Sequence, residues 1–261
     1  MKDEAYFSRL KDKIVGACQI CHGSGFVQDG TCQCLYEFRA RHRLLLGNFA
    51  EHLLEISDEF LDKDIDLSFS RPYVNYFSQN PEIVRRQGLS LYVWSERRGV
   101  GKTTLAHVLA KIFARHFARE ENYSRSIHYR FMEIGEFFDL ARKSRSDSYL
   151  NFVHEWDSTL FVLDDFGNED RSSKWDFEFI TKLIQDFLRH RTRLRLSTII
   201  TTNTRPSVIK EQYKEDVSSL LEVQPNEHVG GLLWREVFIQ GRDFRLARDL
   251  SPWKEVDLAS S

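Results

Sequence analysis

The second half of the chain alternates between short apolar runs and longer amphipathic segments. Apolar, β-prone runs predict strands over 89–94, 127–132, 159–164, 196–202 and 236–240. Apolar residues at helical spacing predict helices over about 105–120, 133–143, 148–156, 174–190 and 206–222. Strands that alternate with helices predict an α/β fold, with a mostly parallel five-stranded sheet covered on both faces.

The first half shows no such alternation and divides into two parts by composition. Residues 1–46 hold all the cysteines and a basic helical tail, and residues 47–88 form a connector with helical pieces. Residues 89–261 form the main domain. The tail carries an apolar stripe near helical spacing, formed by Leu35, Phe38, His42, Leu45 and Leu46. The pattern alone does not decide whether this stripe faces a partner or packs on the main domain.

Composition narrows the class of protein. The chain has 261 residues, of which 41% are hydrophobic and 29% charged, so a sizeable core forms and wholesale disorder is excluded. With 37 basic and 39 acidic residues the net charge is -2, which excludes a grossly basic nucleic-acid coat but leaves a local basic face open. No apolar run approaches the ~20 residues of a membrane span, and no signal peptide is visible. We therefore expect a cytoplasmic protein with no membrane partner.

The four cysteines lie in one stretch, at Cys18, Cys21, Cys32 and Cys34. Two tight pairs, C-x2-C and C-x-C, flank a short glycine-containing hairpin. Zn²⁺ prefers four thiolates in a tetrahedron, and clustered thiols in a reducing compartment bind metal more often than they form disulfides. We expect a small four-cysteine zinc module at the start of the chain.

Two other metal centres use similar residues. The C-x-x-C-H sequence from Cys18 to His22 also matches c-type haem attachment, but that chemistry belongs to exported proteins and gives Cys32 and Cys34 no role. An iron–sulfur cluster also takes four thiolates, and the spacing does not exclude one, although two tight pairs favour zinc. His22 is either a substitute ligand or a surface residue of the module.

A glycine loop follows the first predicted strand of the main domain and leads into a helix, which is the context of a Walker A phosphate loop. Lys102 would reach the β- and γ-phosphates of ATP, and the Thr103 hydroxyl would hold Mg²⁺. The pattern wants glycine at position 96, where Glu96 stands, so a surface turn remains the alternative. We expect nucleotide contacts from Gly99, Val100, Gly101, Lys102, Thr103 and Thr104.

Polar residues end two further strands. Asp164 and Asp165 follow the apolar run 159–163, which is typical of a Walker B arrangement: Asp164 would position Mg²⁺ and Asp165 would activate water. Asn203 ends the strand 196–202, where it either orients the attacking water or is a simple turn residue. Basic residues cluster at 142–145 and 189–195 and would either contact single-stranded DNA or form solvated loops.

Together these motifs resemble the AAA+ ATPases, specifically the replicative helicase loaders of the DnaC/DnaI type from bacteria and phages. The resemblance rests on the cysteine module, Ser-Glu-Arg-Arg-Gly-Val-Gly-Lys-Thr (95–103), Asp-Asp-Phe-Gly (164–167), Thr-Thr-Asn (201–203) and Gly-Arg-Asp-Phe-Arg (241–245). It implies a sensor role for Asn203 and for Arg245. The usual Ser-Arg-Leu box reads Ser-Ser-Leu here, at 218–220, so we expect Arg235 to be a possible substitute for the arginine that reaches a neighbouring subunit's ATP.

The resemblance implies an ATPase that is weak alone and stimulated by a partner or DNA. It further implies a loader that binds a hexameric replicative helicase, uses ATP, Mg²⁺ and Zn²⁺, forms a homo-oligomer, and helps place the helicase on single-stranded DNA. Two alternatives stay open: a transposition helper ATPase of the IstB-like kind, and a nucleotide-independent adaptor with a decayed phosphate loop. The cysteine module favours the loader, because the helpers generally lack it.

Overall fold

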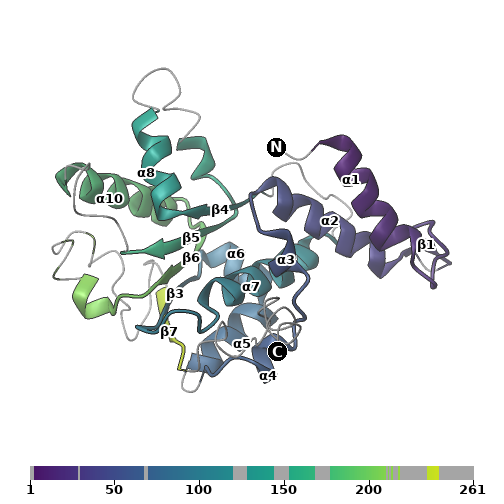
Figure 1. Cartoon of the computed structure of the whole chain (residues 1–261), viewed down its shortest axis with the longest axis horizontal. Coiled ribbons are helices and arrows are strands. Elements are labelled where there is room, and N and C mark those ends of the chain that lie inside the picture. Colours follow the sequence, from purple (N-terminus) through teal and green to yellow (C-terminus); the bar gives the residue numbers. More distant parts are fainter. Residues whose placement is uncertain are drawn as a thin grey trace, which may run out of the picture.

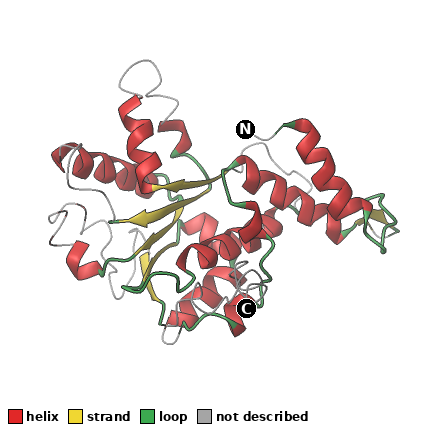
Figure 2. Ribbon diagram, in the orientation of Figure 1, coloured by secondary structure: helices red, strands yellow, loops and turns green. Residues whose placement is uncertain are grey.

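A parallel five-stranded sheet forms the centre of the chain (Figures 1 and 2). In this computed structural model the described residues are 3–28, 30–67, 70–119, 128–143, 153–167, 177–209, 211, 213, 217 and 234–240. The strand order is β4 (Tyr129–Glu133), β5 (Leu160–Phe166), β6 (Ser197–Thr202), β3 (Ser90–Trp94) and β7 (Trp234–Phe238). All neighbouring pairs are parallel, so the carboxyl ends of the strands meet at one edge of the sheet.

Each face of the sheet buries its own hydrophobic core, because successive side chains of a strand point to opposite faces. Leu91, Leu160 and Val162 belong to one core, which the helices α5 (Arg71–Gln79), α6 (Pro81–Gln87) and α7 (Lys102–Phe117) complete. Phe161 and Leu163 belong to the other, completed by α8 (Ile134–Lys143) and α10 (Phe177–Arg193). The near-continuous apolar strands are thus the expected signature of a sheet covered on both sides.

The N-terminal arm, residues 3–46, projects from one side of the sheet domain (Figure 1). It contains α1 (Glu4–Lys11), the π-helical segment η1 (Asp12–Gly16), a hairpin of β1 (Phe26–Val27) and β2 (Gly30–Thr31), and α2 (Gln33–Leu46). The hairpin lies at the outer end, and α2 runs from it toward the sheet domain. There α2 packs along α7 and reaches β4.

The inner end of α2 is fixed to the edge of the sheet. The Gly47 carbonyl accepts a hydrogen bond from the Phe131 amide of β4 at 2.7 Å. A Cβ atom at position 47 would lie only 2.0 Å from the Tyr129 carbonyl oxygen, so this approach requires glycine. The connector then continues through the short helices α3 (Glu51–Leu54) and α4 (Phe60–Lys63).

The apolar stripe of α2 packs inside the chain for most of its length. Leu45 is buried, Phe38 packs against the main core, and His42 contacts the Phe7 ring of α1. Leu46 is exposed. One hydrophobic core contains residues from the arm, the connector and the sheet domain, so the predicted boundaries at 46/47 and 88/89 do not mark a gap in packing.

The predicted sheet is confirmed, and the elements shift by a few residues at their ends. Helix α7 begins at Lys102, three residues before the predicted start, because Gly101 with φ 94° caps it and its first turn is polar. Strand β7 begins two residues early, at Trp234. Much of the predicted helices 148–156 and 206–222 lies outside the described residues.

The basic cluster 189–195 is not a uniform surface. Arg191 is buried and donates hydrogen bonds to the Trp156 and Ser158 carbonyls at 2.6 and 2.9 Å, and to the Ser197 carbonyl and Thr198 hydroxyl. Burial lowers the pKa of its guanidinium to about 9, which leaves it charged at neutral pH. The prediction that Arg191 contacts DNA or lies in a solvated loop is therefore wrong. Its side chain joins α10 to β6 and to the turn before β5.

We predict that Arg191→Met destabilises the protein by about 3–5 kcal/mol, because several buried carbonyls lose their donors together. Arg193→Met is the matched control: Arg193 ends the same helix but is exposed, and its replacement is expected to change the unfolding free energy by less than about 0.5 kcal/mol. Urea unfolding measures both. Equal unfolding free energies for the two variants would contradict the role of Arg191.

Candidate functional site

Three strand ends bring the predicted site residues together. The phosphate loop follows β3, the two aspartates end β5, and Asn203 follows β6. Strand β6 lies between β3 and β5, so the loop and the aspartates approach each other across its end. Open α/β sheets bind ligands at this edge.

The loop between β3 and α7 has the conformation that a phosphate loop needs. Gly99 and Gly101 have φ values of 73° and 94°, which other residues rarely adopt. The first amides of α7 have no partner within the helix and lie at the positive end of its dipole. Lys102 opens the helix, is only 7% exposed, and donates hydrogen bonds to the Arg97 and Ser95 carbonyls at 2.8 and 3.3 Å. Its ammonium group thus lies inside the loop.

Glu96 occupies the motif's first glycine position without distorting the loop. It is not among the described residues with positive φ, so this position does not need the conformational freedom of glycine. Its side chain points outward and forms an ion pair with Arg205, whose Nε lies 2.7 Å from Oε1. The departure from the motif is therefore confined to a surface contact.

Asp164 is buried beneath the loop and contacts the first turn of α7. It accepts a hydrogen bond from the Thr103 hydroxyl at 3.0 Å and another from the Thr201 hydroxyl. Burial raises the pKa of this carboxyl to about 6, and the two hydroxyl hydrogen bonds oppose the rise. A carboxylate and a hydroxyl at this distance offer the hard oxygen ligands that Mg²⁺ prefers.

Asp165 projects where β5 leaves its regular pairing with β6. A register shift lies between Leu163 and Phe166, and Asp165 has φ 62°, an uncommon value for a residue other than glycine. The Asp165 amide donates to the Thr201 hydroxyl at 3.1 Å, which holds this conformation. Its exposed carboxylate accepts a hydrogen bond from the Asn203 side chain at 3.2 Å. Such strain is typical of functional sites.

A cavity of about 730 Å³ joins these groups. Its size suits a nucleotide-sized ligand. The polar side is formed by the phosphate loop, the strand ends and the start of α7: Arg98, Gly99, Gly101, Lys102, Thr103, Thr104, Asp164, Asp165, Thr201 and Asn203.

The rest of the cavity lining comes from the connector, which the sequence did not assign to the site. Its residues are His52, Leu53, Ile56, Phe60 and Asp64. Leu53, Ile56 and Phe60 have three- and four-residue spacing, which is equally typical of an ordinary core helix. We call these five residues the base wall.

Two other predicted residues that the structure describes do not contribute side chains to this cavity. The Val100 side chain is buried in the core, so only its backbone remains for a ligand. Arg235 lies on β7 beside Leu91, with its guanidinium 5.7 Å from the Tyr73 ring centroid, and lines a separate cavity. Arg245 and the segment 218–220 lie outside the described residues.

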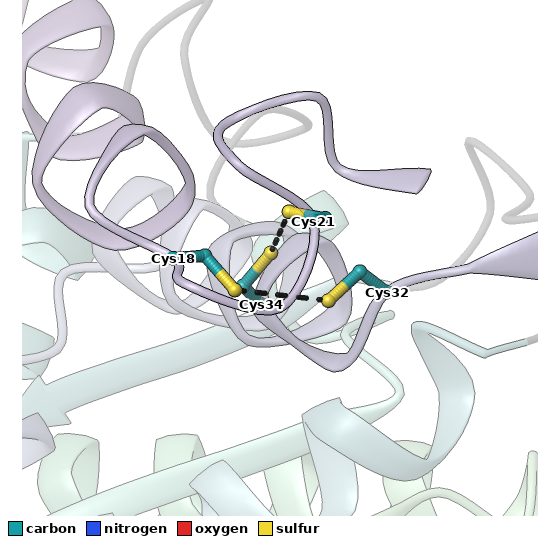
Figure 3. A group of neighbouring side chains, drawn as sticks. All are labelled: Cys18, Cys21, Cys32 and Cys34. Carbon is teal, nitrogen blue, oxygen red and sulfur yellow. Dashed lines mark hydrogen bonds between the residues drawn. The ribbon is translucent and has the colours of Figure 1, made fainter. Parts of the chain in front are cut away.

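The four cysteine sulfurs converge at the outer end of the arm (Figure 3). Their Sγ atoms all lie within 4.8 Å of one another, with 3.8 Å between Cys18 and Cys32 and 3.5 Å between Cys21 and Cys34. A tetrahedron of Zn–S bonds of about 2.3 Å has sulfur–sulfur edges of about 3.8 Å, whereas a disulfide bond is about 2.05 Å. The arrangement therefore fits a four-coordinate metal ion.

The hairpin supports thiolate chemistry and leaves His22 outside the cluster. Burial raises the pKa of the Cys21 thiol, but hydrogen bonds from the Gly25 amide and the neighbouring thiols outweigh it and lower the pKa to about 6. The Gly25 amide donates to Cys21 Sγ at 3.2 Å. His22 is exposed and is not part of the group that offers metal ligands among the described residues.

Apolar side chains are exposed around this hairpin. Ile20 is 74% exposed, Phe26 58% and Val27 37%. We call these three residues the hairpin tip. Exposed apolar residues gathered on a small module mark an interaction surface more often than isolated ones do.

No family model matches the chain, and no curated protein matches its sequence. Solved structures do match its fold. The crystal structure of the DnaI is 18% identical, with 75% of this chain covered, 93% of that chain covered and a TM-score of 0.51. A DNA replication initiation factor is 14% identical, with 78% of this chain and 56% of that chain covered and a TM-score of 0.50. The crystal structure of the DnaC helicase loader is 24% identical to this chain, with 66% of this chain and 89% of that chain covered and a TM-score of 0.46.

At these identities the likeness to DnaI and to the initiation factor concerns the fold. The fold class predicted from the sequence, a parallel five-stranded sheet with helices on both faces, is confirmed, and the four cysteines cluster as expected. None of the helices that the structure describes is long and apolar enough to cross a membrane. The chain is thus similar in fold to proteins of DNA replication, as the motifs predicted.

Proposed function

We propose that this protein is an ATP-dependent helicase loader: it binds ATP–Mg²⁺, captures a hexameric replicative helicase and assists its placement on single-stranded DNA. The observation that carries the proposal is the single cavity shared by Lys102, Thr103, Asp164, Asp165 and Asn203. The motif resemblance and the fold likeness to DnaI support the replication role.

In this proposal each polar group of the cavity has a distinct task. The Lys102 ammonium group and the amides at the start of α7 bind the phosphates, which are stronger acceptors than the carbonyls that Lys102 now contacts. Thr103 and Asp164 hold Mg²⁺, which neutralises charge on the phosphates. Asp165 accepts a proton from the attacking water, and Asn203 fixes the Asp165 carboxylate.

The base wall receives the nucleoside. With the phosphates at the loop, the remaining cavity is bounded by Leu53, Ile56 and Phe60. The half-buried Leu53 and Ile56 and the buried Phe60 suit one face of a purine ring, and the exposed His52 and Asp64 line the same cavity.

Hydrolysis by the isolated chain is expected to be slow. An arginine supplied by another subunit contributes ~10³–10⁵ in rate, and the cavity contains only Arg98 among the described arginines. Arg235 is the proposed substitute: it lies away from its own chain's cavity, as a residue acting on a neighbouring subunit would. Arg245 keeps its proposed sensor role. The assignment of Arg235 implies a homo-oligomer.

The arm is proposed to hold one Zn²⁺ and to contact the helicase. A hairpin this short buries too little surface to hold its fold alone, so metal binding supplies folding energy. The helicase-facing surface is the hairpin tip rather than the stripe of α2, since most of that stripe packs against α1 and the core. The exposed basic residues, including Arg193 and Arg195, are proposed to bind the phosphates of single-stranded DNA.

We predict that Lys102→Ala removes ATP–Mg²⁺ binding in calorimetry, because no other buried lysine lines the described part of the cavity. Lys143→Ala, an exposed lysine on α8, is the matched control and keeps wild-type affinity. Equal affinities in all three proteins would favour the nucleotide-independent adaptor instead.

We predict that Cys32→Ser combined with Cys34→Ser releases one equivalent of zinc, measured by elemental analysis of the purified proteins. ATP affinity is expected to stay within about threefold of wild type, since the cluster lies at the outer end of the arm. Iron in the wild-type protein would contradict zinc, and metal retained by the double variant would contradict the ligand set.

The proposed function is tested by capture of the host's purified hexameric helicase, with and without ATP. We predict that Ile20→Asp with Phe26→Asp abolishes capture while zinc content and ATP affinity stay unchanged. Leu194→Asp, which changes another exposed apolar residue in the turn between α10 and β6, is the control and retains capture. Failure of the wild type to bind the helicase would overturn the loader proposal. Capture by the double variant would show that the helicase binds a surface other than the hairpin tip.

A further inference from the structure

A buried lysine on α7 takes no part in the phosphate site. Lys111 is only 4% exposed and lies nine residues after Lys102, about 13 Å along the helix. Its ammonium group donates hydrogen bonds to the Leu54 carbonyl at 3.4 Å and to the Ile56 carbonyl. Burial lowers the pKa of Lys111, and the Asp58 carboxylate opposes this shift. A buried cation is costly unless it is paired, so these partners must be held in place.

These carbonyls belong to the segment that forms the base wall. Leu53 and Ile56 line the nucleotide cavity, and Leu54 lies between them in the chain with its side chain buried in the core. The helix α3 has only four residues, and so short a helix is not stable on its local hydrogen bonds alone. The lysine therefore fixes a segment that local structure alone leaves weakly held.

The same lysine is linked to the N-terminal arm through a series of ion pairs. Asp58 lies 3.2 Å from the Lys111 ammonium group and also pairs with Arg115, one turn further along α7. Arg115 Nε lies 3.3 Å from a carboxylate oxygen of Glu37 on α2. Glu37 also pairs with Arg41 at 2.6 Å. We call Glu37, Asp58, Lys111 and Arg115 the α7 bridge.

We propose that the α7 bridge positions the base wall, so that Lys111 sets the affinity for the nucleoside part of the nucleotide without acting on its phosphates. This inference rests on the proposed ATP binding. Lys111 is a positioning residue: it touches the backbone behind the wall and is absent from the cavity lining. Through Glu37, the helix that carries Cys34 is coupled to the same wall.

The test compares two ligands by calorimetry in the presence of Mg²⁺: ATP, and inorganic tripolyphosphate, which has no base. Lys111→Met keeps the length of the side chain but removes its charge and its hydrogen bonds. We expect ATP to bind this variant about tenfold more weakly, while tripolyphosphate affinity changes less than twofold. Lys143→Met is the matched control and leaves both affinities unchanged, whereas Lys102→Ala loses both ligands.

Two further variants extend the test to the rest of the bridge. Asp58→Asn changes a half-exposed partner, so it keeps the test possible if Lys111→Met does not fold, and it too is expected to weaken ATP selectively. Glu37→Gln is expected to give a smaller selective loss of about threefold. Its control is Glu82→Gln, which removes an ion pair between α6 and His116 of α7 without touching Asp58.

The outcomes separate this inference from the proposed function. Equal weakening of ATP and tripolyphosphate in the folded Lys111 or Asp58 variant, or no change in either ligand, would overturn the bridge while leaving ATP binding intact. A wild-type protein that binds neither ligand would overturn both.

Discussion

A helix that lies largely within the core must find a partner for every buried polar group that it carries, and α7 carries three such side chains. Lys102, His107 and Lys111 are each less than a tenth exposed. Lys102 is satisfied by the loop before the helix, whereas His107 and Lys111 are satisfied by the connector. The His107 ring bonds to the Thr103 carbonyl at 2.8 Å and accepts from the Ala50 amide at 3.1 Å, and burial lowers its pKa to about 4. Because unpaired buried polar groups are costly, the connector is held against the helix, and that contact creates the second wall of the cavity.

The sequence predicted the sheet and the phosphate side of the site because both depend on short-range pattern. Buried parallel strands are apolar throughout, so their positions are visible as runs, and the residues that end them converge wherever the strands are parallel. Lys102, Thr103, Asp164, Asp165 and Asn203 were found in this way, and they do share one cavity. The early start of α7 was missed, since its first turn is polar and the apolar pattern begins only at Leu105.

The connector and the arm could not be predicted in the same way. Whether Leu53 and Ile56 face a ligand or a core depends on which elements pack beside them, and helical spacing is identical in both cases. Arg191 has the same ambiguity: among neighbouring basic residues nothing in the sequence distinguishes the one that is buried. The conformation of Asp165 is likewise imposed by Thr201 from the next strand, a contact between residues 36 positions apart.

The arrangement of α2 and α7 gives the chain a physical basis for communication between its two proposed sites. Two of the four clustered cysteines, Cys32 and Cys34, lie at the start of α2, and α2 packs along the helix that opens with Lys102. Two ligands that act on a shared element are coupled reciprocally. If nucleotide binding changes the affinity of the arm for its partner by some factor, the partner changes the affinity for nucleotide by the same factor. Apolar packing alone between α2 and α7 would transmit only rigid displacement. The ion pairs from Glu37 through Arg115 to Asp58 add an electrostatic link between α2, α7 and the connector. In the proposal above, a metal ion in the arm and a nucleotide against the base wall would therefore both act on the arrangement of α7.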